Sequence, residues 1–117
     1  MQSTLLAWAR EFPASVTVCD RQGIILEMND RSARTFEKDG GRALIGRSVL
    51  DCHPDPARGK LERLMEAVQT NVYTIEKNGI KKLIYQTPWY RDGQVAGFVE
   101  FSFEIPFDMP QVVSGGA

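Results

Sequence analysis

The sequence has few of the residues on which reactive and metal-binding sites usually depend. Its 117 residues include one histidine and two cysteines. Cys19 and Cys52 do not form a Cys-x-x-Cys pair, so a zinc ribbon or a thioredoxin-like site has no support. A disulfide framework in so short a chain would need more cysteines, whereas free thiols fit a reducing compartment. We therefore expect a cytoplasmic protein whose cysteines are not paired.

Long apolar runs and an excess of one charge are also missing. The longest apolar stretches, such as 23–26, are far shorter than the roughly 20 residues that span a bilayer, so we expect no membrane association. The N-terminus lacks a basic region and a cleavage site, which argues against a secretory signal. Fourteen basic and fifteen acidic residues are scattered along the chain, so the sequence shows no basic surface for nucleic acid.

Motifs for catalysis are absent as well. The sequence contains no phosphate loop, dinucleotide fingerprint or His-Glu-x-x-His motif. A nucleophile needs a positioned base, but His53 directly follows Cys52, and neighbours on a chain rarely face each other productively. Asp51 and Asp55 flank His53, and capping of the following helix explains them without a metal. We therefore expect a sensor or interaction module and not an enzyme.

Two segments have the apolar spacing of helices. The composition, 43% hydrophobic and 25% charged, is that of an ordinary globular domain with one core. Residues 1–13 form a short amphipathic pattern that ends at a proline, with an apolar stripe of Leu5, Leu6, Trp8 and Phe12. A longer helix is predicted from about Pro56 to near Thr70, with a core-facing stripe of Leu61, Leu64, Met65 and Val68.

Strand patterns lie on both sides of this long helix. Segments 16–19 and 24–28 surround a turn, and three further strands between Val72 and Ile105 are joined by Asn78-Gly79 and by a turn at 91–94. Pro88 predicts an edge or a bulge in its strand. The sequence thus predicts an α+β domain at 14–106, with a five-stranded antiparallel sheet, helices on one face and a flexible tail at 107–117.

This order of elements resembles the PAS domain, a small sensory and interaction family. The resemblance rests on three segments in order, namely Val16-Thr17-Val18-Cys19-Asp20 with Gly23-Ile24-Ile25 and Met28-Asn29, then Leu44-Ile45-Gly46-Arg47, and then Gly93-Gln94-Val95-Ala96-Gly97-Phe98-Val99-Glu100. It implies a five-stranded sheet with a helical side that can hold a ligand. The segment around Cys52 does not match the motif of the flavin photosensors, so flavin is disfavoured as a cofactor.

The resemblance implies a ligand cavity between the long helix and the sheet. His53 or Cys52 facing that cavity could bind haem iron, although a loop role for both residues is the favoured reading. The aromatic strand face that contains Tyr85 and Phe101, together with Trp89 and Phe103, would line the cavity, unless it simply packs as core. The sequence does not decide between a hollow and a filled centre.

The N-terminal stripe predicts an interface. Leu5, Leu6, Trp8 and Phe12 are large for so short a helix, and the strands leave apolar residues on the outer sheet face. We expect a homodimer through this helix. The first functional hypothesis is a sensor that binds a small ligand and signals through dimer contacts or a downstream signalling protein. The alternative is an interaction module with a solid core and no ligand.

Overall fold

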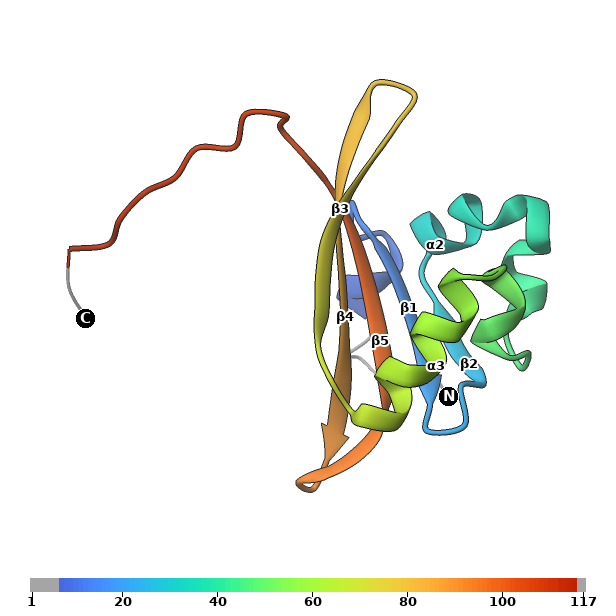
Figure 1. Cartoon of the computed structure of the whole chain (residues 1–117). Coiled ribbons are helices and arrows are strands. Elements are labelled where there is room, and N and C mark those ends of the chain that lie inside the picture. The colour runs from blue at the N-terminus through green and yellow to red at the C-terminus, as the bar shows by residue number, and fades with distance from the viewer. Residues whose placement is uncertain (1–6, 116–117) are drawn as a thin grey trace.

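The computed structural model describes residues 7–115, apart from the side chain of Cys52. Figure 1 shows a curved sheet with most of the helical segments gathered on one side. The chain forms, in order, α1 (Ala7–Arg10), β1 (Ser15–Asp20), β2 (Ile25–Met28), α2 (Asp30–Thr35), the 3-10 helices η2 (Glu37–Asp39), η3 (Gly41–Leu44) and η4 (Val49–Cys52), α3 (Ala57–Ala67), β3 (Asn71–Lys77), β4 (Ile80–Arg91) and β5 (Gln94–Ile105).

The five strands form one antiparallel sheet in the order β2-β1-β5-β4-β3. The first two and the last three strands are joined by hairpins, and the helical segment crosses over between them, as the sequence predicted. The element α2, the 3-10 helices and α3 lie on one face, which we call the inner face (Figure 1). The short α1 lies against the other, outer face, where its residues border a groove with side chains of β1, β4 and β5.

Two hairpin turns show why the strand boundaries could be read from the sequence. Lys77 pairs with Ile80, so the loop between β3 and β4 is Asn78-Gly79, and both residues have positive φ, 54° and 76°. Asp92 and Gly93 repeat this between β4 and β5, with φ of 50° and 79°. Asn, Asp and Gly tolerate this conformation, and its twist matches that of the flanking strands.

The strand β4 lies inside the sheet, between β5 and β3. Its ladder with β5 is regular at Pro88, which pairs with Phe98, and shifts register between Trp89 and Tyr90, where Ala96 of β5 is the extra residue. Of the two alternatives that Pro88 predicted, the edge strand is not observed, and the irregularity of the ladder begins after the next residue, Trp89. Because a bulge gives one strand an extra residue, it sets which residues of β4 and β5 share a face beyond it.

The well-packed core lies beneath the short helices and not beneath α3. Its buried cluster consists of Ile25, Met28 and Leu44, with Phe36 and Val49 packed against it. By contrast, none of the residues of α3 is buried. The long helix therefore covers its part of the sheet with half-buried side chains.

The long helix is shorter than its sequence pattern suggested. It ends at Ala67, and Val68 adopts a left-handed conformation with φ 53° and ψ 52°. The N–H of Val68 donates to the carbonyl of Met65, and the N–H of Gln69 to that of Leu64, which closes the last turn. Val68 is 36% exposed and does not continue the core-facing stripe, because the chain has already left the helix at this residue.

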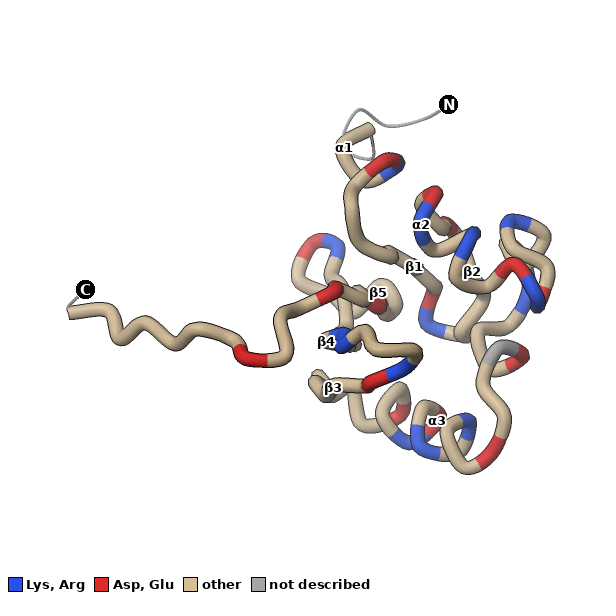
Figure 2. Tube along the Cα trace, turned by 90° about the horizontal axis from the view of Figure 1, so that it is seen from above, with Lys and Arg blue, Asp and Glu red and all other residues tan. Residues whose placement is uncertain are grey.

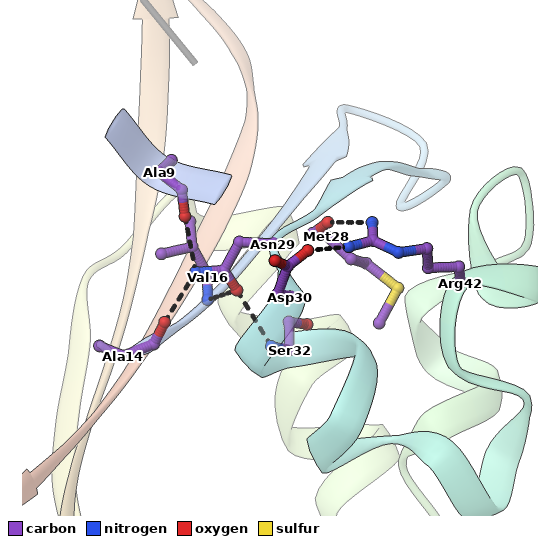
Figure 3. Close-up of polar contacts among 8 residues, drawn as sticks. All are labelled: Ala9, Ala14, Val16, Met28, Asn29, Asp30, Ser32 and Arg42. Atoms are coloured by element: carbon purple, nitrogen blue, oxygen red, sulfur yellow. Dashed lines mark hydrogen bonds and ion pairs between the residues drawn. The ribbon is translucent and has the colours of Figure 1, made fainter. Parts of the chain in front are cut away.

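Asn29 joins β1, α1 and α2 through four side-chain hydrogen bonds (Figure 3). Its Oδ1 accepts from the N–H groups of Val16 and Ser32, at 2.9 and 3.0 Å. Its Nδ2 donates to the carbonyls of Ala9 and Ala14, at 2.9 and 2.7 Å. Asn29 is thus the N-cap of α2, and it also fixes the segment that leads into β1.

Charged residues of both signs are mixed over the surface. Seen from above, positions of Lys and Arg alternate with positions of Asp and Glu along α3 and around the short helices (Figure 2). No helix in the described range 7–115 is long and apolar enough to cross a bilayer.

Candidate functional site

A small cavity lies where α3 crosses the inner face of the sheet. Its volume is about 40 Å³, and the surface exposed to it is mostly apolar, although polar side chains are among its lining residues. The helix contributes Leu61, Leu64 and Met65, while Cys19 and Phe98 lie on the floor. Drug-sized ligands occupy pockets of about 300–1,000 Å³, so the cavity holds only a few waters or a very small molecule in this arrangement.

A row of polar side chains crosses the floor of the site. The strand registers align Asn71 of β3, Gln86 of β4, Glu100 of β5 and Thr17 of β1 on the inner face. The Asn71 amide donates to Gln86 Oε1 at 3.1 Å, and Gln86 Nε2 donates to Glu100 Oε2 at 2.7 Å. At the other end, the hydroxyls of Thr17 and Ser32 are hydrogen bonded at 2.5 Å. Of the four residues in the row, Thr17, Gln86 and Glu100 line the cavity, and Asn71 does not.

Glu100 makes a small contribution to the pKa shifts of two side chains on the sheet. Burial raises the pKa of Cys19 from 9.0 to about 11. A hydrogen bond with the backbone of Phe98 opposes this shift, and the negative charges of Asp20 and Glu100 add smaller contributions to it. Burial also raises the pKa of Tyr73, and Glu100 again contributes. Cys19 is therefore a protonated thiol at neutral pH and not a nucleophile, since the thiolate is the reactive form. Glu100 is the charged group at the centre of this floor.

His53 lines the cavity from the segment between η4 and α3. Its Nδ1 lies 2.9 Å from the backbone oxygen of Val49, so this nitrogen is the protonated one when the ring is neutral. The Nε2 atom then carries the lone pair, which is the tautomer that a metal-binding histidine uses. Among the residues that the structure describes, no group of three or more His, Cys, Asp and Glu side chains is placed to hold a metal ion.

The residues present do not fit haem in this arrangement. The ring orientation of His53 is suitable, but the cavity beside it is about 40 Å³. A porphyrin is larger than the ligands of ordinary pockets, which already need about 300 Å³ or more. Haem would enter only if α3 moved well away from the sheet. The side chain of Cys52, the other candidate iron ligand, lies outside the described part of the chain.

Tyr85 and Phe101 do not line the cavity, contrary to the sequence-based expectation. Tyr85 and Phe101 pair with each other across β4 and β5. Their chain neighbours Gln86 and Glu100 lie on the inner face, and successive strand residues alternate between faces, so Tyr85 and Phe101 lie on the outer face. Phe101 stacks on Phe103 with ring centres 5.7 Å apart and borders the outer groove. The sequence-based expectation placed this aromatic face toward the core and the cavity, whereas the inner face carries the polar row.

The outer face has a broad groove of about 960 Å³ between α1 and the sheet. Trp8 borders it and is 57% exposed. Phe12 links the N-terminal segment to the sheet, because its ring makes edge-to-face contacts with Trp8 at 5.5 Å and with Phe103 at 6.5 Å. The structure thus brings two of the four predicted interface residues to the outer face. The other two, Leu5 and Leu6, lie outside the described residues.

Sequence reasoning missed the polar row. Gln86 and Glu100 are polar residues within otherwise apolar strands, and that contrast was the available signal. Polar residues at alternate strand positions are usually assigned to the solvent side, so the signal points to the wrong face unless the position of α3 is known.

Comparison with known proteins agrees with this architecture. The sequence pattern of a family described as the PAS fold matches residues 10–105. The PAS domain of BvgS from Bordetella pertussis is 20% identical with a TM-score of 0.64, and the match covers 89% of this chain and 88% of that chain. The PAS domain of an HTR-like protein from Haloarcula marismortui is 18% identical with a TM-score of 0.61, and the match covers 86% and 88%.

A third similar structure is that of the Aer2 receptor from Vibrio cholerae, described as a dual PAS-haem oxygen sensor. It is 12% identical with a TM-score of 0.58, and the match covers 80% of this chain and 95% of that chain. Its similarity shows a shared fold. None of the curated proteins matches the sequence.

Proposed function

The chain belongs to the PAS family, and we propose that it is a sensor that binds a small molecule between α3 and the inner face of its sheet. The PAS fold is typical of signalling proteins, and PAS domains are generally sensory or interaction modules. In this proposal the ligand acts by favouring one of two positions of α3, since a ligand shifts an equilibrium only by its differential affinity for the two states.

The observation that carries the proposal is that α3 is incompletely packed against the polar residues of the inner face. The apolar residues of the helix are half-buried, and a cavity remains beneath them. Burying polar groups is costly, and the side chains of the polar row offset that cost with hydrogen bonds to one another, which hydrogen bonds to a ligand can replace. A solid-core interaction module would be expected to fill this space with apolar side chains.

A cavity-filling substitution tests this proposal. Leu64→Trp places a large ring against the cavity, whereas Arg63→Trp places the same ring at an exposed position of α3. We expect small probes such as isobutanol to shift the backbone NMR signals of Phe98, Glu100 and Met65 in the wild type. Leu64→Trp should weaken this binding at least about tenfold, because the ring takes the space of the probe, and Arg63→Trp should leave it unchanged.

Two outcomes would contradict ligand binding at this site. In one, the probes shift only signals of the outer groove. In the other, Leu64→Trp binds the probes as well as the wild type does. Either result would favour the module with a filled core.

Signal output through a dimer is the second part of the proposal, and the exposed tryptophan of α1 supports it. Trp8 is 57% exposed beside an open groove with an apolar floor. Exposed aromatic side chains at the centre of a concave, mostly apolar surface are typical of protein interfaces. A second copy that packs α1 against this face would bury the ring.

We expect Trp8→Ala to weaken the dimer, because truncating a central aromatic anchor costs about 2 kcal/mol or more of binding free energy. Light scattering coupled to size exclusion would then show the mass fall from that of two chains toward that of one. Tyr90→Ala is the matched control, since Tyr90 is an aromatic residue on β4 that is 58% exposed and does not border the groove. An unchanged mass for Trp8→Ala would remove α1 from the interface.

A further inference from the structure

Glu100 combines three properties that a purely structural carboxylate does not need. It lies at the centre of the sheet on the inner face, where β5 is flanked by β1 and β4. It lines the cavity beneath α3. Its charge reaches both Cys19 and Tyr73, whose pKa values it helps to raise. The fold therefore keeps a negative charge where most proteins place an apolar side chain.

The hydrogen-bonding capacity of Glu100 is only partly used. The Gln86 amide donates to Oε2 at 2.7 Å. Within the described residues, no Lys or Arg nitrogen lies within 4.0 Å of this carboxylate, because the ion pairs there are Arg42–Asp30, Arg47–Asp51 and Arg58–Glu62. An ionised carboxylate has about four acceptor positions, and Gln86 is the one side chain of the described residues that donates to it.

The remaining walls define the rest of the ligand. The side chains of Leu61, Leu64 and Met65 close the cavity from above with apolar surface. Phe98 supplies an aromatic surface next to Glu100 on the same face of β5. An apolar body suits these walls, and a charged donor suits the carboxylate at the floor.

Resting on the sensor function proposed above, the geometry points to a small primary ammonium compound with an apolar body as the ligand class, its cation held by Glu100 and its body beneath α3. An anionic ligand would meet the charge of Glu100, and no Lys or Arg is among the residues that line the cavity. A neutral apolar ligand would leave the acceptor positions of the carboxylate unused.

Three probes of equal shape separate the charge from the body: isobutylammonium, isobutanol and isobutyrate. We expect isobutylammonium to bind the wild type at least about tenfold more tightly than isobutanol, as measured by titration of the NMR signals of Phe98, Glu100 and Met65. Isobutyrate should bind more weakly than either. Glu100→Gln keeps an oxygen acceptor for Gln86 and removes the charge, so it should bind the ammonium and the alcohol equally.

Glu104→Gln is the control, because Glu104 lies on the same strand, is exposed, and does not line the cavity. It makes the same change in net charge and should preserve the preference for the ammonium probe. Equal binding of ammonium and alcohol in the wild type would overturn the inference and leave the sensor proposal standing. Survival of the preference in Glu100→Gln would overturn it in the same way. Failure of all three probes to reach the cavity would overturn both.

Discussion

Replacing Gly97 by alanine should strongly destabilise the domain. Gly97 is buried in β5 opposite Asp20 of β1. A Cβ atom there would lie 1.9 Å from the backbone oxygen of Cys19 and 2.8 Å from both Asp20 Cα and Trp89 Nε1. The nearest of these atoms belongs to the backbone of a paired strand, so the strands themselves would have to separate.

We expect Gly97→Ala to lower the free energy of unfolding by more than about 4 kcal/mol, which is a large part of the stability of a small domain. The same clash would break the hydrogen bond that Trp89 Nε1 donates to Cys19 at 3.0 Å. Urea denaturation followed by circular dichroism measures the loss. A loss below about 1 kcal/mol would show that the sheet accommodates a side chain here.

Gly59→Ala is the matched control and should have the opposite sign. Gly59 lies within α3, and the nearest atom to its Cβ would be the flexible end of Arg63, at 3.4 Å. Alanine in a helix is favoured over glycine by about 0.5–1 kcal/mol. We expect a small gain in stability, so that the pair of substitutions separates the clash at Gly97 from a general effect of replacing glycine.

Asn29→Ala should produce the second largest loss, about 3–4 kcal/mol of unfolding free energy. The asparagine is 6% exposed and makes four hydrogen bonds, each worth about 1 kcal/mol net. Its removal also leaves the N–H of Val16 and the carbonyl of Ala14 without a side-chain partner inside the protein. Thermal unfolding should show a fall in Tm of more than 10 °C, since about 1 kcal/mol moves Tm by several degrees in a domain of this size.

Asn29→Asp distinguishes the two sides of this amide. The new carboxyl can still accept from Val16 and Ser32, but its second oxygen would face the carbonyls of Ala9 and Ala14, which now receive a donor at 2.9 and 2.7 Å. Burial and these carbonyls would raise the pKa of the introduced carboxyl in the folded state. The folded state then binds the proton more tightly than the unfolded chain does.

The stability of Asn29→Asp should therefore depend on pH in a defined direction. Below the unfolded pKa of about 3.9 the carboxyl is protonated in both states and can donate to one carbonyl. Stability should then be lost as pH rises through the raised folded-state pKa. The difference from the wild type should thus be smaller at pH 4 than at pH 7. A difference that does not change with pH would contradict this account of the amide.

The sequence predicted the order of elements and the sheet, because these depend on local chemistry. Asn78-Gly79 and Asp92-Gly93 require positive φ, so they marked the two hairpins directly. The helical crossover between the first two strands and the last three could be recognised from the apolar stripe of α3. The early end of α3 could not, because Val68 fits the apolar stripe but lies in a left-handed cap that its sequence does not favour.

The faces of the sheet could not be assigned from the sequence. Alternation along β4 separates Tyr85 from Gln86, but it does not state which of them faces α3. The register shift after Trp89 adds a residue to one strand, so counting outward from the turn at Asp92 would place the partners of β4 one residue off. The residues of the candidate site depend on which face of the sheet lies toward α3. Glu100 could therefore be recognised as a site residue only once the position of α3 was known.

The side-chain amide of Asn29 hydrogen bonds to helices on both faces of the sheet. Through Ser32 it holds the start of α2 on the inner face, and through Ala9 it holds α1 on the outer face. A rotation of α2 must therefore either carry the N-terminal segment with it or break a buried hydrogen bond. This single side chain therefore couples the position of α2 to that of α1 directly, without a shift of the strands between them.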